Sequence, residues 1–369
     1  MKQEDAPYES RYMEAAVALA RKSRPSPNPR VGAVLVKDGT IVGAGFHEKP
    51  GTPHAEVNAI ADAGVHAEGA DLYVTLEPCV HFGRTGPCVK AIESACIRRV
   101  FVGMTDPDIR VNGQGIAYLR NAGIEVETGV DESHCRQLLE GYITHRTKGR
   151  PHIILKAAIT LDGYVATTTH DSKWISSSDS RKLAHALRAE ADAVLVGIGT
   201  VLHDDPMLTV RDADGPCPLR IVLDSSLAIP LESKLIRTAE KCPLLLVHNN
   251  IASEERRQQL QKIPGVSILN CKQTPSGHID LSDLATRLAE NGVLSLLVEG
   301  GSQIMSAFLE TPLVDQLVLF IAPKIIGSGI PFTTYPHAEV ISEGLDLTVI
   351  ETKRIGDDIF YRATIKNPS

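Results

Sequence analysis

The feature that most constrains this chain of 369 residues is a set of three metal-ligand side chains in its first quarter. His54, Cys79 and Cys88 offer one imidazole and two thiols, which are ligand types that zinc prefers. Three protein ligands leave one position of a tetrahedral zinc ion open to water, and bound water of this kind loses a proton near a pH of about 7. The set therefore predicts a catalytic zinc site, and the fold has to bring both thiols to one histidine.

A carboxylate two positions after the histidine indicates what such a site does. In zinc deaminases a His-x-Glu pattern is followed by Pro-Cys, and the glutamate moves protons without binding the metal. Here Glu56 follows His54, and Pro78 precedes Cys79. A structural zinc site with His81 as fourth ligand is the alternative, but it would leave Glu56 without a function. The pattern departs from the common Cys-x-x-Cys ending, because Cys79 and Cys88 are farther apart.

Length and composition predict a two-domain globular protein. The chain is 43% hydrophobic and 22% charged, which is ordinary for such proteins. Its net charge of -7 argues against a nucleic-acid partner. No apolar run approaches the length of a membrane span, and the polar start Met1–Asp5 lacks the apolar core of a signal peptide. The 7 scattered cysteines predict free or metal-bound thiols in a reducing compartment, so we expect a cytoplasmic protein without a disulfide framework.

The first half alternates helical and extended patterns, which predicts an α/β domain with helices on both faces of a sheet. His54 and Glu56 stand at the start of a helix, where both can face one metal site. Cys79 and Cys88 are each expected near a helix start, where the helix dipole favours thiolate. The expected helices are 12–20, 55–61, 115–122 and 132–146, and the expected strands are 31–36, 41–46, 72–76, 99–103 and 123–126.

The second half continues this alternation after a linker at Lys148–Pro151. Two strands end in glycine turns, at Gly197–Gly199 and at Gly300–Gly301. Such turns suit phosphate binding or are ordinary strand-to-helix turns, and the third glycine of the dinucleotide fingerprint is missing. The expected strands are 152–160, 193–196, 220–223, 243–247, 266–269, 294–298, 316–322 and 359–365, the last as part of an antiparallel hairpin. The expected helices are 178–191, 254–261 and 281–290.

Three motifs of the first half carry a specific resemblance. They are Pro27-Asn28-Pro29-Arg30-Val31-Gly32, Pro53-His54-Ala55-Glu56-Val57 and the segment from Glu77 to Cys88. Together they resemble the N-terminal domain of the bifunctional deaminase/reductase family of riboflavin biosynthesis. The resemblance implies a cytidine-deaminase-like three-layer domain over residues 1–149, which removes an amino group from a pyrimidine carrying a ribosyl phosphate.

The resemblance also implies roles for residues of this first domain. His54, Cys79 and Cys88 would bind Zn2+, and Glu56 would be the catalytic proton donor. Where the family usually has Asp-Pro-Asn-Pro, this chain has Asp106-Pro107-Asp108-Ile109, so an acidic residue replaces an amide at a substrate contact. The expected substrate contacts are Asn28, His47, His81 and Arg84, with Arg84 near the phosphate.

Motifs of the second half resemble the reductase domain of the same family. They are Lys156-Ala157-Ala158, Leu161-Asp162-Gly163, Trp174-Ile175-Ser176, the segment from Gly199 to Arg211, and Val298-Glu299-Gly300-Gly301. The implied fold over residues 150–369 is dihydrofolate-reductase-like, and the implied cofactor is NADPH. Lys156 and Asp204 would handle protons. The cofactor contacts would be Ala158, Trp174, Thr200, Asp204, Ser225, Gly301, Ser302, Gln303, Ile304, Met305, Ser306 and Ala307. The substrate contacts would be Ser172, Arg188, Leu208, Arg211 and Glu299, with both arginines on the phosphate.

We therefore expect a two-site enzyme of riboflavin biosynthesis that deaminates a phosphorylated ribosylaminopyrimidine and then reduces its ribosyl group to ribityl. One alternative is a base deaminase whose second half recognises RNA, but the acidic charge and an aromatic content of 4% count against it. Another is a chain with one inactive half, which the intact residues at both sites disfavour. We expect no nucleic-acid or membrane partner, and we expect a homo-oligomer.

Overall fold

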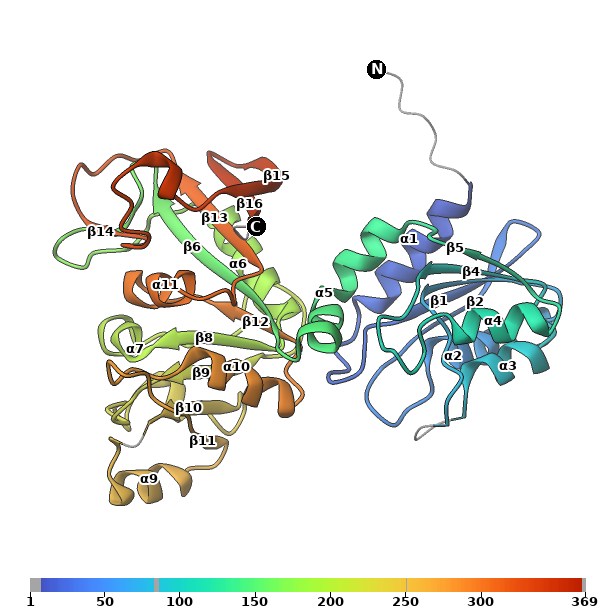
Figure 1. The fold of residues 1–369 in the computed structure, drawn as a ribbon, viewed down its shortest axis with the longest axis horizontal. Helices are drawn as coiled ribbons and strands as arrows, with labels where there is room; N and C mark the ends of the chain where they lie inside the picture. Colours follow the sequence, from blue (N-terminus) through green and yellow to red (C-terminus); the bar gives the residue numbers. More distant parts are fainter. Residues whose placement is uncertain (1–7, 83–85, 250, 367–369) are drawn as a thin grey trace. The chain divides into compact units, whose positions relative to one another are not determined.

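A computed structural model of the chain describes residues 8–82, 86–249 and 251–366 (Figure 1). The chain divides between Arg150 and Pro151 into two units, beside the boundary proposed from the sequence. Among the described residues, no helix combines the length and the apolar character needed to cross a bilayer.

The first unit is built on a five-stranded sheet in the order β2-β1-β3-β4-β5. β1 pairs antiparallel with β2 and β3, whereas β3, β4 and β5 run parallel. Every residue of β3 is buried, which explains why its sequence is a short continuous apolar run. The strands are β1 (Gly32–Lys37), β2 (Thr40–Phe46), β3 (Asp71–Leu76), β4 (Arg99–Met104) and β5 (Glu125–Thr128).

Helices cover both faces of this sheet and complete three layers (Figure 1). α1 and α5 contact each other on one face, and α2, α3 and α4 lie together on the other. This arrangement confirms the three-layer α/β domain expected from the sequence. The helices are α1 (Tyr8–Ala20), α2 (Ala55–Ala63), the 3-10 turn η1 (Gly64–His66), α3 (Cys88–Ser94), α4 (Gln114–Asn121) and α5 (Glu132–Lys148).

The second unit is built on a nine-stranded sheet in the order β11-β10-β9-β8-β12-β6-β13-β16-β15. The strands from β11 to β13 run parallel, and β16 pairs antiparallel with both β13 and β15. The strands are β6 (His152–Thr160), β8 (Ala193–Gly197), β9 (Leu219–Leu223), β10 (Leu244–His248), β11 (Val266–Asn270), β12 (Ser295–Val298), β13 (Gln316–Ala322), β15 (Leu347–Ile355) and β16 (Asp358–Ile365), with a separate pair β7 (Tyr164–Ala166) and β14 (Ile330–Pro331).

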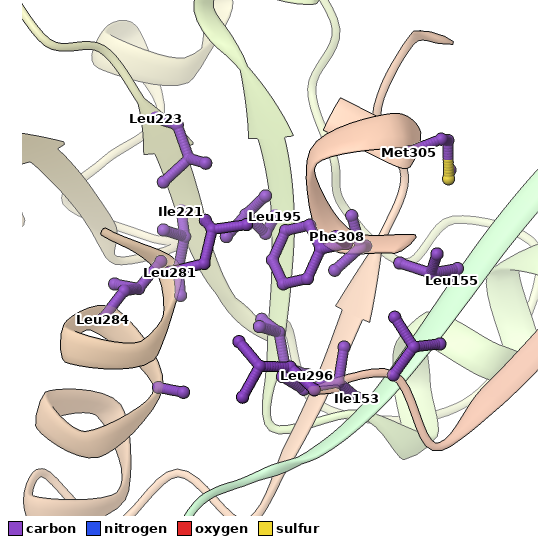
Figure 2. Packing of buried hydrophobic residues seen from close by; sticks show 14 of the residues in the cluster. Ile153, Leu155, Leu195, Ile221, Leu223, Leu281, Leu284, Leu296, Met305 and Phe308 are labelled. Atoms are coloured by element: carbon purple, nitrogen blue, oxygen red, sulfur yellow. The ribbon is translucent and has the colours of Figure 1, made fainter. Parts of the chain in front are cut away.

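Two apolar clusters hold helices against the two faces of this second sheet. On one face Leu195 and Leu296 pack with Phe308 of α11 and Leu284 of α10 (Figure 2). The neighbouring residue Val194 points to the other cluster, which includes α6, α8 and α9, because side chains alternate along a strand. The helices are α6 (Ser178–Glu190), α7 (Ile198–Asp204), α8 (Lys234–Arg237), α9 (Glu254–Gln261), α10 (Leu281–Glu290), α11 (Ser302–Leu309) and the 3-10 turn η2 (Ile341–Glu343).

Two sequence expectations differ from the structure. Cys88 begins α3 as expected, but Cys79 lies in an irregular segment after β3, because Pro78 and the following loop residues do not start a helix there. Cys217 and Cys242 form a disulfide, although no disulfide was expected. They are separated by 25 residues, and the fold brings their Cα atoms to 5.9 Å. The last strand was expected as part of an antiparallel hairpin, and the antiparallel pairing of β16 with β15 confirms this; the bounds of β15 were not predicted, because several of its residues face solvent and give no apolar run.

Two glycines allow α2 to approach the sheet closely. A Cβ atom at Gly43 would lie 2.4 Å from the backbone oxygen of Ala59, and one at Gly45 would lie 2.4 Å from the backbone nitrogen of the same residue. Because α2 carries Glu56 and follows directly after His54, these glycines set the position of the candidate metal site.

We expect Gly45→Ala to lower both the stability and the zinc content of the protein. The added methyl group has to displace α2, and overpacking of this kind costs about 1–3 kcal/mol. Thermal unfolding and metal analysis would measure the two effects. Gly199→Ala is the control, because a Cβ atom there would meet no atom within 4 Å. Normal zinc binding in Gly45→Ala would show that the close approach does not position the site.

Candidate active sites

Three elements of the first unit bring the predicted metal ligands together. His54 precedes α2 in an extended conformation, Cys79 follows β3, and Cys88 is the first residue of α3. The Nδ1 atom of His54 lies 3.1 Å from the Sγ atom of Cys88 and 3.5 Å from that of Cys79, and the two Sγ atoms are 3.5 Å apart. Among the described residues, no further histidine, cysteine or carboxylate joins these three as a fourth ligand.

The group fits a zinc ion with three protein ligands. Zinc lies about 2.0–2.3 Å from nitrogen and sulfur ligands, which places tetrahedral ligand atoms roughly 3.5 Å apart. The observed separations are close to this value. A hydrogen bond with Cys88 lowers the pKa of Cys79, so Cys79 is disposed to bind metal as a thiolate, whereas the hydrogen bond with Cys79 and burial raise the pKa of Cys88. His81 is not part of the group, so the arrangement favours a catalytic over a structural zinc site.

Glu56 is the second residue of α2, and it lies buried beside the metal-ligand group. Burial, together with the charge of the Cys79 thiolate, raises the pKa of Glu56 to about 6. A carboxyl group that titrates near neutrality can both accept and donate a proton. Glu56 is therefore suited to proton transfer at this site.

A cavity of about 420 Å³ lies beside these residues. Asn28, His47 and His81, which the sequence predicts as substrate contacts, all line it. Arg84, the fourth, lies outside the described residues. The lining residues are Pro27, Asn28, Pro29, Val31, His47, Pro50, Gly51, Thr52, His54, Glu56, Leu76, Glu77, Cys79, His81, Asp106, Asp108, Arg110, Val111, Tyr142 and Arg146.

A buried histidine orients one of these contacts. The Nδ1 atom of His47 lies 3.2 Å from the backbone oxygen of Pro53, which can only accept a hydrogen bond. Nδ1 therefore carries the proton, and Nε2 accepts a hydrogen bond from the Asn28 amide group at 2.9 Å. Burial lowers the pKa of His47, which keeps the ring neutral. The Asn28 side chain is thus held with its carbonyl oxygen available as an acceptor.

Glu77 holds in place the segment between β4 and α4, which forms one wall of the cavity. Its carboxylate accepts hydrogen bonds from the backbone N–H groups of Asp106, Gly113, Gly115 and Ile116 at 2.8–3.2 Å. Glu77 thereby fixes the segment between β4 and α4 beside the end of β3.

Sequence reasoning missed Arg110, Tyr142 and Arg146 as residues of this wall. They are isolated in the sequence and belong to none of the quoted motifs. The helix predicted from the sequence could have placed Tyr142 and Arg146 on the same helix face, since they are four residues apart.

A second group of charged residues lies in the other unit, around Glu299. Arg188 donates hydrogen bonds from Nε and Nη2 to the two carboxylate oxygens at 2.5 and 2.7 Å, and the Lys156 Nζ atom lies 3.5 Å from Oε2. Burial raises the pKa of Glu299, but the charges of Arg188 and Lys156 outweigh this effect and lower the pKa to about 2. Glu299 is therefore an anion at neutral pH. Two donor nitrogens of the Arg188 guanidinium, Nε and Nη2, are engaged by it.

The predicted cofactor residues gather near the carboxyl ends of neighbouring parallel strands. Thr200 lies on α7 after β8, Ser225 follows β9, and Gly301 to Ala307 form the start of α11 after β12. Because β9, β8, β12 and β6 are adjacent, these residues share one edge of the sheet, near Ala158 of β6. This edge is where parallel α/β sheets bind ligands.

Other predicted residues of this half are not joined to the Glu299 group. Trp174 is 64% exposed, with the guanidinium of Arg181 4.4 Å from its ring centroid. Asp204 is exposed at the end of α7, and Leu208 is buried with a positive φ of 52°. Within the described residues, no hydrogen bond or ion pair connects Arg211 or Ser172 to Glu299.

Comparisons with known proteins agree with this division into two sites. Residues 7–104 match the family model described as "Cytidine and deoxycytidylate deaminase zinc-binding region", and residues 151–361 match "RibD C-terminal domain". The chain is 46% identical to the riboflavin biosynthesis protein RibD of Aquifex aeolicus, over 95% of this chain and 97% of that protein. It is 37% identical to RibD of Escherichia coli, over 94% of this chain and 97% of that protein.

Solved structures resemble the whole chain. RibD of Acinetobacter baumannii matches with a TM-score of 0.86 at 34% identity, and the match covers 98% of this chain and 99% of that one. The diaminohydroxyphosphoribosylaminopyrimidine deaminase/5-amino-6-(5-phosphoribosylamino)uracil reductase of Thermotoga maritima matches with a TM-score of 0.84 at 35% identity, covering 97% and 99%.

Proposed function

Because this chain belongs to the RibD family of riboflavin-biosynthesis proteins, we propose that its two sites catalyse consecutive reactions on one phosphorylated pyrimidine. The chain is a bifunctional deaminase and reductase, and its cofactors are zinc and NADPH. The first unit removes an amino group from a diaminopyrimidinone that carries a ribosyl phosphate. The second unit reduces the ribosyl group of the product to ribityl.

The observation that carries the deaminase assignment is the convergence of His54, Cys79 and Cys88 on one metal site, beside a cavity that Glu56 lines. Zinc held by the three ligands would supply a Lewis acid that activates water at neutral pH. Glu56 takes a proton from the water and delivers it to the departing amino group. The carbon–nitrogen bond breaks, a carbon–oxygen bond forms, and ammonia leaves.

Asn28 and His47 would orient the pyrimidine ring in this cavity. The neutral His47 ring holds the Asn28 amide group, so the Asn28 carbonyl oxygen can accept a hydrogen bond from a ring N–H or amino group of the substrate. This pair therefore favours a substrate that presents a donor beside the reacting carbon.

In the second unit, NADPH would supply the hydride and Lys156 a proton. The residues at the strand edge fit the cofactor, because a Cβ atom at Gly301 or Gly199 would meet no atom within 4 Å. The backbone is open there, and the N–H groups at the start of α11 can receive a phosphate. Thr200, Asp204, Ser225 and Trp174 would contact other parts of the cofactor.

Glu299 and the two arginines would have different functions. Arg188 is paired with Glu299 and keeps this carboxylate charged, and the carboxylate in turn positions the Lys156 Nζ group, from which the proton would be donated. Arg211 would then provide the charged hydrogen bonds to the substrate phosphate, near Leu208 and Ser172.

We also propose that the enzyme acts in the cytoplasm as a homo-oligomer. A reducing compartment would keep Cys79 and Cys88 available as metal ligands. β15 is the edge strand of its sheet, and Val349 and Ile350 on it are exposed, which supports pairing with a second copy.

We expect Glu56→Gln to retain one zinc ion per chain. The rate of ammonia release should fall by about two to four orders of magnitude, because the group that carries the proton is removed. Reduction of separately supplied deaminated substrate should persist. Metal analysis and the two activity assays measure these effects, and Glu68→Gln, an exposed glutamate outside the cavity, is the control. Near-normal ammonia release would assign the proton transfer to another group.

We expect Arg211→Ala to raise the KM for the substrate of reduction by about ten- to hundredfold, because a charge-assisted hydrogen bond contributes about 1.5–3 kcal/mol. NADPH affinity should stay unchanged. Steady-state kinetics with each substrate varied would separate the two, with Arg237→Ala of α8 as the control. A loss of NADPH affinity instead would place Arg211 at the cofactor.

A further inference from the structure

One buried arginine of the second unit has no function in the reactions described above. Arg220 is the second residue of β9, and its relative exposure is 0%. Because side chains alternate along a strand, it points to the same face of the sheet as Val222, where α8 packs. A buried charged group costs free energy unless its donors are bound, so the partners of Arg220 indicate its function.

The guanidinium group of Arg220 is bound by acceptors from three parts of the chain. Nη1 donates hydrogen bonds to the backbone oxygen of Met207 at 3.0 Å and to Oγ1 of Thr238 at 2.7 Å. Nη2 donates to the backbone oxygen of Leu235 at 3.1 Å and to that of Cys242. The two Nη groups therefore fasten the segment that contains Met207 to α8 and to the residues before β10.

These partners hold a charge without balancing it. Burial lowers the pKa of Arg220 to about 10, so the group is still protonated at neutral pH. Among the described residues, its hydrogen-bond acceptors are three backbone oxygens and one hydroxyl group, and none is a carboxylate. Hydrogen bonds from a charged donor are stronger than neutral ones, and the planar guanidinium directs them in fixed directions. Arg220 is therefore suited to holding backbone segments together.

The chain segment 207–217 is fastened beside Arg220 at both of its ends. Its first residue, Met207, binds Nη1 through the backbone oxygen. Its last residue, Cys217, forms a disulfide with Cys242, whose backbone oxygen binds Nη2. The segment therefore leaves the guanidinium group and returns to it.

Residues between these two ends reach the proposed site of reduction. Leu208 is buried, which fixes the segment against the core beside α8. The backbone oxygen of Thr209 accepts a hydrogen bond from Nη1 of Arg188 at 3.4 Å, and Arg188 binds Glu299 through its other two nitrogens. Arg211 follows two residues after Thr209. The placement of Arg211 therefore depends on how firmly the start of the segment is held.

We propose that Arg220 is a positioning residue for the reduction, which holds segment 207–217 so that Leu208 and Arg211 meet the substrate. This proposal rests on the proposed function, in which Arg211 binds the substrate phosphate. Arg220 is fully buried and does not touch the substrate itself. Its replacement should therefore weaken substrate binding through the placement of Arg211, and should leave NADPH binding and deamination unchanged.

The test replaces Arg220 with lysine, which keeps a charge but offers one donor nitrogen in place of two Nη groups. The KM for the substrate of reduction should rise about tenfold, because a charge-assisted hydrogen bond from Arg211 is weakened. The KM for NADPH and the kcat/KM of deamination should stay unchanged. Steady-state kinetics of the intact chain measures all three quantities.

Arg256→Lys is the matched control. Arg256 also binds backbone oxygens of the second unit, those of Leu227 and Ile229, but none in segment 207–217. This variant should leave the KM for the substrate of reduction unchanged. An equal rise in both variants would overturn the proposal, because the loss would then follow from any weakened arginine contact.

A double-mutant cycle separates positioning from general support of the fold. If Arg220 acts through Arg211, the variant that combines Arg220→Lys with Arg211→Ala should have the substrate KM of Arg211→Ala alone, to within about twofold. Two effects that multiply would overturn the proposal, and so would an unchanged KM in a folded Arg220→Lys variant.

Thermal unfolding shows whether Arg220→Lys is folded. If it is not, Thr238→Val decides, because it removes one acceptor of Nη1 and keeps nearly the same side-chain shape. The KM for the substrate of reduction should then rise at least about twofold, as expected for one weakened hydrogen bond, and an unchanged KM would overturn the proposal. Failure of the proposed function is a separate result, in which the wild-type chain does not oxidise NADPH with the deaminated substrate.

Discussion

The deaminase half depends on one constraint, which is the convergence of three metal-ligand atoms within 4.8 Å of one another. The ligands come from three separate elements, so each element has to be placed by its own packing. Gly43 and Gly45 let α2 approach β2, and the buried strand β3 delivers Cys79 at its end. Glu77, two residues before Cys79, anchors the opposite wall through backbone hydrogen bonds. The metal site and the substrate cavity are therefore set by the same strand end.

The reductase half is also organised by a carboxylate at the end of a strand, which is Glu299. Glu299 follows directly after a parallel strand, as Glu77 follows β3, but it binds side chains and not backbone N–H groups. Arg188 and Lys156 keep it charged although it is buried, so the pair of cations and the carboxylate act as one unit. In both units, a carboxylate at the end of a central strand organises the residues of the candidate site.

Much of the fold and of the metal site could be predicted from the sequence, because both depend on local signals. Short segments are enough to recognise the buried runs of β3 and β13, the His54–Glu56 pair and the separated cysteines. Arg146 could not be found this way, since only the packing of α5 brings it to Asp108. The Cys217–Cys242 disulfide was missed because an odd number of scattered cysteines gives no pairing signal. The C-terminal hairpin was predicted, but the bounds of β15 were not, because an exposed edge strand has no apolar run.

We propose that the two sites of this chain act in sequence on the same compound. This order can be tested by mixing the purified protein with NADPH and the diaminopyrimidinone ribosyl phosphate, and by following ammonia release and NADPH oxidation together. We expect ammonia to appear first, and NADPH to be consumed only as the deaminated product forms. NADPH oxidation that begins without a lag and continues when ammonia release is blocked would contradict this order.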